Sequence, residues 1–462
     1  MIVKLAIRSL FAHPVRSAVL AAGFGAGVAV MAILLGVGQV VLEQARSPVL
    51  VGGGDVVITG AAPGITAAGV LLSSTLRRPP LAARARAASP SSRAMLYLVR
   101  DGSVTPVRAR GGVPSLERAL GDPEVSGVTA WTDAPADAAW SAPDPADVLR
   151  AIDRFRPVPD VPARASSWAE WLYFNGRSPA ARFYLTFLAG PARPDGTRGA
   201  GVRLQLERGG RIMSFDAASA LDQTAVAVAP DLTIGANKVR LQGLRYHLTL
   251  DLRGEGGHRA AGDLFIEGSA GGMMPPIEIH GAGGWRSGYV VPVMSGVLGG
   301  TILVDGERVS LDGGVGYHDH NWGFWKGVSW QWGQVQDGDL SVVYGRVFPP
   351  ADAADPARIP GFLAAIGPDG PIGYATNVTI DEVNDPVTSR PRRITVRGRS
   401  TSIDLTLAFS VEALNVNRMQ SGPLEGAMDF LQLRGRYAVD GTAGDRRLAF
   451  QSPGSAETFR GH

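Results

Sequence analysis

The chain contains 462 residues, carries a net charge of +3 and has no cysteine. This length exceeds that of one compact core, so we expect at least two domains. The lack of cysteine excludes disulfides, thiolate metal sites and cysteine nucleophiles, and the small net charge with scattered arginines argues against nucleic acid binding.

An uncharged stretch near the amino terminus predicts a transmembrane helix at 17–42. No ionisable side chain occurs from Ser17 to Leu42. As a helix, this stretch would reach roughly 39 Å, enough to cross a bilayer with tilt. We favour a retained anchor over a cleaved signal peptide, because Glu43–Pro48 is a poor cleavage site.

The charges around this stretch predict the orientation of the anchor. Three basic residues precede it and only Arg46 follows it closely: Lys4, Arg8 and Arg16. The positive-inside rule then predicts a cytoplasmic tail at 1–16. We therefore expect a single-pass protein of the inner (cytoplasmic) membrane, with its main body in the periplasm. Gly23 and Gly27 either form a helix-packing face or reflect the ordinary glycine content of membrane helices.

Residues Leu5–Leu10 and His13–Ser17 resemble the start of the FtsX/MacB-type permeases of ABC transporters. The resemblance covers roughly the first 60 residues. It implies ABC transporter subunits as partners. Those permeases have further membrane spans, and no second apolar run of adequate length occurs here.

Residues 43–93 are predicted to form a basic linker rich in proline and alanine. No acidic residue occurs between Asp55 and Asp101, whereas arginines recur among its proline, alanine and serine residues, including Arg77, Arg78, Arg84, Arg86 and Arg93. A solvated tether is the favoured interpretation. Contact with anionic lipid headgroups is the alternative.

The segment 94–160 is predicted to be a small membrane-proximal α+β region. Met95–Val99 and Val104–Ala109 flank an Asp-Gly turn signal, which favours a hairpin. A short helix is expected to begin at Pro114 and to end at Gly121, and a second helix is expected over 144–154.

Beyond Pro162 the pattern is typical of antiparallel β structure. Val202, Leu204 and Leu206 alternate with polar residues, and the same period of two recurs from Ile403 to Val411. The 60 glycines and 32 prolines also favour short strands joined by turns. The sequence therefore predicts a mainly β protein with barrels or sandwiches.

Aromatic and polar residues concentrate in one window, from Tyr317 to Trp332. In an extended strand, successive side chains point to opposite faces. Three of these residues then share one face and three the other: Tyr317, Asp319 and Asn321, and His318, His320 and Trp322. Both faces cannot serve the same cavity. Downstream, Trp330, Trp332 and Gln334 again share one face.

An aspartate beside indole rings has the ingredients for acid chemistry on an alkene. Burial raises the pKa of a carboxyl group, and aromatic faces stabilise a developing cation. The alternative is a structural element in which Asp319 and the histidines satisfy one another. A third interpretation uses His318 and His320 as metal ligands with His280 or His247. No carboxylate spacing supports it, so neither a metal nor a cofactor is expected.

Several motifs in the same order resemble the AttH/carotenoid 1,2-hydratase (hydroxyneurosporene synthase) family. They are Glu170–Gly176, Pro292–Gly296, Gly316–Gly323 and Trp330–Gly333. The resemblance covers about 160–462. It implies two consecutive lipocalin-like antiparallel β domains, at 161–325 and 326–462. Leu172 departs from the family, which often has a second tryptophan there.

The resemblance also implies site residues. Asp319 is the candidate acid, and Tyr317, His318 and His320 would assist it. The remaining candidates would bind the ligand: Trp171, Tyr173, Asn175, Asn321, Trp322, Trp325, Trp330 and Trp332.

Two functions follow from these expectations. The first is a membrane-anchored extracytoplasmic protein that binds a hydrophobic, isoprenoid- or lipid-like ligand, associated with an ABC exporter. The second is an acid-catalysed hydratase or cyclase of an isoprenoid or carotenoid-like chain, with Asp319 as the proton donor. Fold analogy cannot choose between binding and catalysis.

Overall fold

The computed structural model describes residues 84–461 with gaps at 101–102, 122–124, 126, 138–142 and 420–427, and short stretches between residues 12 and 31. Most of the predicted tail at 1–16, the second half of the predicted span at 17–42 and nearly all of the linker at 43–93 lie outside the described residues. Within the part of the chain that the structure describes, no helix is both long and apolar enough to cross a membrane.

The chain divides into two compact units, of which the first comprises 1–63 with 85–141. Its strands β1 (Ser91–Arg100) and β2 (Ser103–Gly112) form the expected antiparallel hairpin. Helix α4 (Pro114–Ala119) follows. Gly121, just after this helix, has a positive φ of 73°, a conformation that glycine adopts without strain. The second unit comprises 64–84 with 142–462.

Helix α7 (Pro145–Ile152) belongs to the second unit, although it was expected within the membrane-proximal region. Asp144 caps it by accepting a hydrogen bond from the backbone N–H of Ala146 at 2.8 Å. Its apolar face, with Val148, Leu149 and Ile152, is buried in the core of the barrel that follows. The helix therefore leads the chain directly into that barrel.

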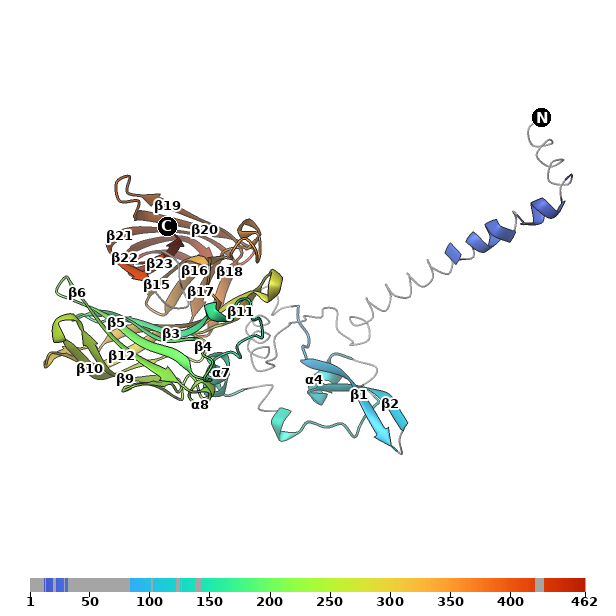
Figure 1. Cartoon of the computed structure of the whole chain (residues 1–462), viewed down its shortest axis with the longest axis horizontal. Helices are drawn as coiled ribbons and strands as arrows, with labels where there is room; N and C mark the ends of the chain where they lie inside the picture. The colour runs from blue at the N-terminus through green and yellow to red at the C-terminus, as the bar shows by residue number, and fades with distance from the viewer. Residues whose placement is uncertain are drawn as a thin grey trace. The chain divides into compact units, whose positions relative to one another are not determined.

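The first barrel is built from a 12-stranded antiparallel sheet. Its ring follows the order β10-β12-β14-β3-β4-β5-β6-β9, and the pairing of β9 with β10 closes it (Figure 1). The strands of the ring are β3 (Trp168–Arg177), β4 (Arg182–Ala192), β5 (Arg198–Arg208), β6 (Arg211–Leu221), β9 (Arg245–Gly254), β10 (Arg259–Glu267), β12 (Arg286–Val304) and β14 (Gly314–Phe324).

Short elements complete this sheet and its connections. They are β7 (Thr233–Ile234), β8 (Asn237–Gln242), β11 (Met274–His280), β13 (Glu307–Ser310), α8 (Gln223–Ala227), η1 (Ala165–Ser167), η2 (Glu255–Gly257) and η3 (Ala282–Gly284). Alternation along the strands decides which residues fill the barrel. Leu204 and Leu206 of β5 point into the core, as their spacing predicted, and its largest fully buried side chains are Trp168, Trp285 and Trp322.

The second barrel is a 9-stranded antiparallel sheet in the order β18-β17-β16-β15-β23-β22-β21-β20-β19. Its strands are β15 (Ser329–Asp337), β16 (Leu340–Phe348), β17 (Phe362–Gly367), β18 (Gly370–Ala375), β19 (Asn377–Asn384), β20 (Pro391–Arg399), β21 (Ile403–Met419), β22 (Met428–Ala443) and β23 (Arg446–Gly461), with η4 (Pro356–Arg358) between β16 and β17. Among the described residues, β18 and β19 do not pair. The hydroxyl of Ser400, directly after β20, nevertheless donates to the carbonyl oxygen of Tyr374 in β18 at 2.7 Å. The barrel is therefore nearly closed.

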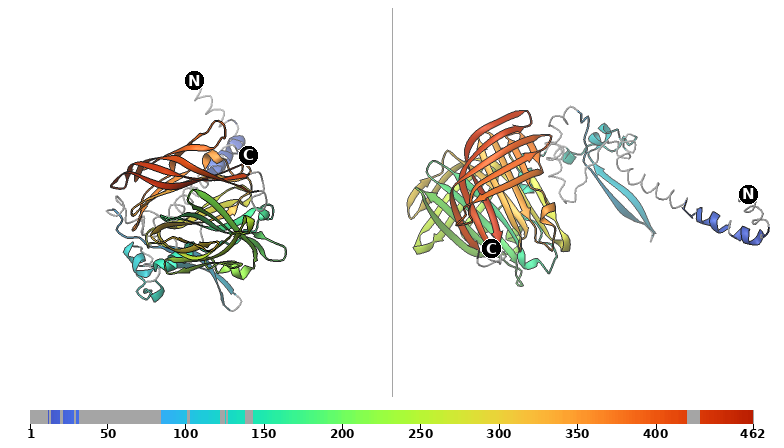
Figure 2. Two further views of the ribbon diagram at one scale, coloured as in Figure 1. Left: turned by 90° about the vertical axis from the view of Figure 1, so that its left-hand side faces the viewer. Right: turned by 90° about the horizontal axis from the view of Figure 1, so that it is seen from above.

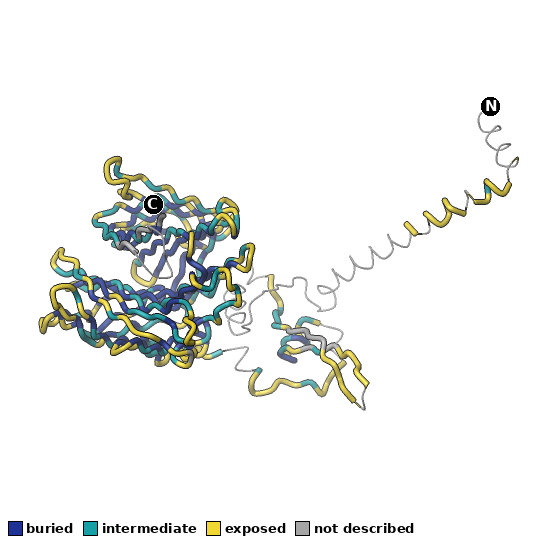
Figure 3. The backbone as a smooth tube through the Cα atoms, viewed as in Figure 1, coloured by how far each residue is buried: buried dark blue, intermediate teal, exposed yellow. Residues whose placement is uncertain are grey.

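The two barrels pack side by side in the views of Figures 1 and 2. Outward-facing side chains of both barrels form a third buried cluster between them, which contains Tyr173, Tyr289 and Tyr317 of the first barrel and Trp332 and Phe362 of the second. The backbone on both sides of this contact is largely buried (Figure 3). The predicted fold class is therefore confirmed: the protein is mainly β, with two consecutive antiparallel barrels.

Candidate functional site

Strand β14 divides the predicted site residues between two environments. Tyr317 belongs to the buried cluster between the barrels, and Asp319 and Asn321 on the same face of the strand line a cavity there. Trp322, on the opposite face, lies in the core of the first barrel. The alternation expected for an extended strand is thus present.

His318 and His320 form a closed hydrogen-bond network inside the first barrel. Nε2 of His318 lies 3.0 Å from Oδ2 of Asp153, and Nδ1 of His320 lies 2.9 Å from Oδ1 of the same carboxylate. Nε2 of His320 lies 2.9 Å from Oε1 of Glu170. The hydroxyl of Tyr246 donates to Oδ2 of Asp153 at 2.7 Å. Asp153 therefore joins the residues after α7 to strand β14.

The charges in this network stabilise one another. Burial alone would raise the pKa of Asp153, but the adjacent His318 and His320 outweigh it and hold that pKa far below its usual range. Burial alone would lower the pKa of His320, but its hydrogen bonds to Asp153 and Glu170 raise it. The network thus favours a carboxylate paired with an imidazolium.

This placement separates His318, His320 and Trp322 from any ligand in the cavity between the barrels. All three are buried in the first barrel. The Nδ1 atom of His318 lies 2.9 Å from the carbonyl oxygen of Tyr173, so every ring nitrogen of the two histidines has a partner. Among the described residues, no group of side chains is arranged to hold a metal ion. The geometry gives these three residues a structural position.

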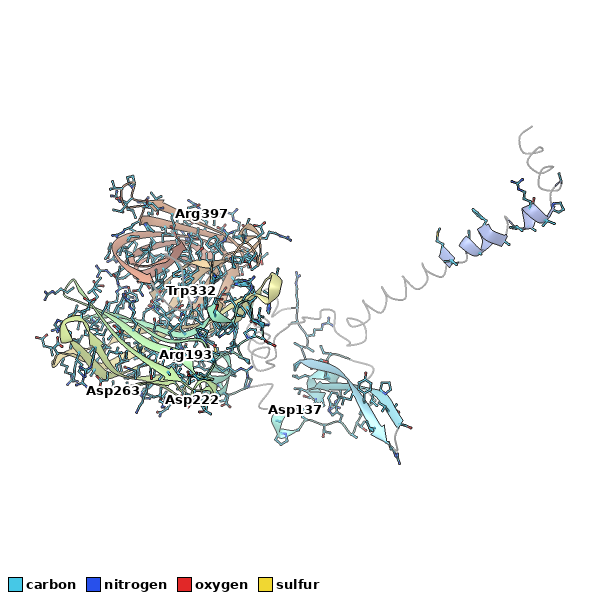
Figure 4. The ribbon with its side chains drawn as sticks, in the orientation of Figure 1. Asp137, Arg193, Asp222, Asp263, Trp332 and Arg397 are labelled. Carbon is cyan, nitrogen blue, oxygen red and sulfur yellow. The ribbon has the colours of Figure 1, made fainter. Side chains whose placement is uncertain are left out.

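A cavity of about 260 Å³ lies between the two barrels, where Figure 4 labels Trp332. One part of it is lined by packed aromatic rings. The centroids of Trp171 and Trp325 are 4.5 Å apart, and those of Trp325 and Trp330 are 5.3 Å apart. Trp330 stacks on Phe459 at 4.2 Å. These rings make one end of the cavity apolar.

Polar side chains line the cavity two residues along the strands from the aromatic rings, as Tyr173 is from Trp171 and Glu457 is from Phe459. Asp319, Tyr173, Thr186, Arg203 and Asp216 are successive cross-strand partners in the first barrel, and all five line the cavity. Two residues of the second barrel, Glu457 and Gln432, also pair with each other and line it. We call these seven residues the polar belt. The register of the strands therefore gives the cavity one apolar end and one polar belt.

Two carboxyl groups of the polar belt have raised pKa values. Burial and the nearby Glu457 raise the pKa of Asp319 well above its usual range, and the interactions with Tyr317 and Asn321 offset this only in part. Burial raises the pKa of Glu457 to about 7. The cavity therefore disfavours ionisation of the first carboxyl, and the second is close to its titration midpoint at neutral pH.

The structure brings most of the predicted site residues together. The residues that line the cavity are Asp319, Asn321, Trp171, Tyr173, Trp325, Trp330 and Trp332. Two others support the contact between the barrels. The hydroxyl of Tyr317 accepts a hydrogen bond from Nε1 of Trp332 at 3.0 Å, and Oδ1 of Asn175 accepts one from Nε2 of Gln334 at 3.0 Å.

Part of the site comes from strands that no motif in the sequence marks. Arg203 and Asp216 belong to β5 and β6, and Glu457 and Phe459 to β23. The order of the second sheet places β23 between β15 and β22, which no local pattern reveals. Strand β23 also contains Arg446, Arg447 and Arg460, so nothing in its local sequence marks Glu457 as a site residue.

The His320 network predicts a pH-dependent stability. Because the pKa of His320 is raised on folding, its contribution is complete below the ordinary value of 6.5 and is lost as pH rises through the raised value. His320→Gln should lower the free energy of unfolding by about 3 kcal/mol near pH 6 and should flatten its decline toward pH 9. Urea unfolding followed by tryptophan fluorescence measures both effects.

The matched control is His280→Gln, because the His280 side chain is 56% exposed. It should change the unfolding free energy by less than about 0.5 kcal/mol. Equal stability of the His320→Gln variant and the wild type at both pH values would contradict the charged network.

No protein-family model and no curated protein sequence matches this chain. Among solved structures, a protein provisionally named AttH from Nitrosomonas europaea is 14% identical, over 66% of this chain and 99% of its own, with a TM-score of 0.40. CghA, solved with Sch210972, is 12% identical, over 64% of this chain and 89% of its own, with a TM-score of 0.44. Both are likenesses of fold alone. The structures of similar fold thus include the protein provisionally named AttH, and the resemblance of the chain's start to permeases gains no support from these comparisons.

Proposed function

We propose that this protein binds a hydrophobic, isoprenoid- or lipid-like ligand in the cavity between its two barrels. The observation that carries the proposal is the aromatic end of the cavity, where Trp171, Trp325 and Trp330 meet Phe459. Ligand sites are typically concave, mostly apolar and equipped with a few polar groups. The cavity of about 260 Å³ has this composition.

The interiors of the barrels are less suited to a ligand. In the first barrel, tightly packed side chains such as Trp168, Phe174 and Phe187 are fully buried. In the second barrel, Tyr344 and Tyr437 fill the core, and their hydroxyls lie 3.3 Å apart. A ligand in either interior would have to displace these side chains, whereas the cavity between the barrels is already open.

We also propose that the barrels are anchored in the cytoplasmic membrane, face the periplasm and exchange their ligand with an ABC exporter. The support comes from the uncharged run at 17–42, the basic residues before it and the permease-like stretch Leu5–Leu10. Crosslinking in intact cells tests this proposal. Recovery of exporter subunits is the expected result, and recovery of no membrane protein would contradict it.

A second candidate function is acid catalysis by Asp319. The observation in its favour is the raised pKa of this carboxyl beside three indole rings. A protonated Asp319 would transfer its proton to an alkene carbon, which forms a C–H bond and leaves a carbocation that the indoles stabilise. Water would then add to the cation and lose a proton to the carboxylate, giving an alcohol and restoring the acid.

The binding proposal predicts that an indole of the cavity is needed to retain the ligand. Trp330→Ala should reduce the amount of co-purifying hydrophobic compound roughly 30-fold, because a buried aromatic anchor of a binding site is lost. Mass spectrometry of organic extracts from the purified full-length protein measures this amount. Trp131→Ala removes an indole that does not line the cavity and should behave as wild type. Equal amounts of compound in all three proteins, or none in any, would contradict the proposal.

The catalytic candidate predicts that Asp319→Asn folds normally and lowers turnover of an isoprenoid substrate by about 10²–10⁴-fold. Wild-type activity should fall as pH rises through the raised pKa of Asp319, because the carboxyl must be protonated to act. Product formation followed by mass spectrometry measures both. Unchanged turnover in the variant excludes Asp319 as the acid.

A further inference from the structure

The polar belt contains two carboxyl groups that lack a basic partner. Asp319 is only 3% exposed, and its carboxylate accepts a hydrogen bond from Nδ2 of Asn321 at 2.6 Å. Glu457 lies close enough across the cavity to raise the pKa of Asp319. Among the described residues, neither carboxyl forms an ion pair with an arginine or lysine. Ionisation of both would therefore leave two negative charges facing each other in a partly buried space.

The single basic residue among the described cavity-lining residues does not resolve this imbalance. Arg203 is the direct cross-strand partner of Asp216, and the charge of Asp216 acts on it. This arginine therefore already has a neighbouring carboxylate of its own. The excess charge of the cavity lining is negative.

A buried hydroxyl also points to a missing polar group. The hydroxyl of Tyr173 lies beside the Glu457 carboxyl at the cavity and has no hydrogen-bond partner of good geometry, although the side chain is only 5% exposed. Burial raises the pKa of this phenol, and the charges of Glu457 and Asp319 raise it further. A buried polar atom without a partner costs free energy, so a ligand that supplies or recruits one would be favoured.

The neighbouring indoles suit a cation. Trp171, Trp325 and Trp330 line the same cavity, and the face of an indole attracts positive charge. The chain uses this interaction elsewhere, since the guanidinium of Arg156 lies 4.3 Å from the ring centroid of Trp322. Carboxylates together with aromatic faces are the usual elements of a site for an organic ammonium group.

We propose that the ligand of this cavity carries a protonated or quaternary amine, which binds between Asp319 and Glu457 while its hydrophobic part packs against the indoles. This inference rests on the proposed function and assigns the chemical class of the ligand. A ligand ending in a carboxylate or phosphate would instead face two carboxyl groups with no free arginine nearby.

Binding of such a cation is coupled to proton release. The groups that face Asp319 are Glu457, Tyr317, Asn321 and, from the opposite face of β14, His320. Tyr173 faces Glu457, and Arg203 with Asp216 completes the charged lining. In the empty cavity, burial and the mutual repulsion of the two carboxyls favour their protonated forms. An arriving ammonium group replaces these protons, so its affinity increases as pH rises.

The experiment compares three probes that share one alkyl chain: hexyltrimethylammonium, hexanol and hexanoate. The full-length protein in lipid nanodiscs is titrated with each, and binding is followed by tryptophan fluorescence. The quaternary ammonium has no titratable proton, so any pH dependence belongs to the protein. We expect it to bind at least about tenfold more tightly than hexanol at pH 8, with hexanoate weakest.

Two double variants separate the carboxyl effect from folding. Asp319→Asn with Glu457→Gln should weaken binding of hexyltrimethylammonium roughly 30-fold and leave hexanol within about twofold, because only the charges are removed. Asp339→Asn with Asp440→Asn removes two carboxylates whose side chains are 62% and 70% exposed, and it should behave as wild type. Retained hexanol binding shows that each variant is folded.

The pH profile gives an independent readout. Between pH 6 and pH 8, the affinity of the wild type for the ammonium probe should rise by up to about tenfold per pH unit for each proton released. Its affinity for hexanol should stay constant. The carboxyl double variant should lose this slope.

The outcomes of this experiment separate failure of the amine inference from failure of the proposed function. If hexanol binds as tightly as the ammonium probe, or if the two carboxyls have no effect, the amine inference is overturned while the hydrophobic site stands. If none of the three probes binds, the proposed function fails and the inference fails with it.

Discussion

The alternation of side chains along β14 is the constraint on which the rest of the structure depends. This strand forms part of the wall of the first barrel and faces the second barrel with its other side. Both faces are buried, so each polar residue on it must find a partner or a binding function. His318 and His320 find partners inside the barrel, whereas Asp319 faces the cavity. One strand thereby joins a structural network to a candidate binding site.

Asp153 and Asp319 are buried to a similar degree, but their surroundings shift their pKa values in opposite directions. Asp153 is 0% exposed and Asp319 is 3% exposed. The pKa of Asp153 is lowered because two histidines contact it, and the pKa of Asp319 is raised because burial and Glu457 act on it without a basic neighbour. The first carboxylate is fixed in the fold. The second can exchange a proton or a counterion, which is the property that both binding of a cation and acid catalysis require.

The sequence predicted the elements that depend on local pattern. The hairpin around residues 101–102, the alternation of Leu204 and Leu206 and the two faces of β14 all follow from a period of two, and the structure contains each of them. The sequence could not predict the partners of these elements. Asp153 meets His318 across a separation of 165 residues, and Glu457 enters the site because β23 pairs with β15.

The location of the cavity was equally hidden from the sequence. The resemblance implied two lipocalin-like domains and a set of site residues, and in a strand buried on both faces no pattern tells which face lines the interior of the barrel. Packing decides the matter here: the interior of the first barrel is filled by large side chains such as Phe174 and Trp285, and the free volume lies outside it. The motif in the sequence therefore drew attention to β14, and its alternation left two faces from which to choose.

The most direct test of the central claim is a crystal structure of the protein with a bromine-labelled alkyl ligand, in which anomalous scattering locates the bromine. We predict a bromine position in the cavity between the barrels, in contact with Trp171, Trp330 or Phe459. A bromine inside the core of either barrel, with the cavity between them empty, would contradict the account.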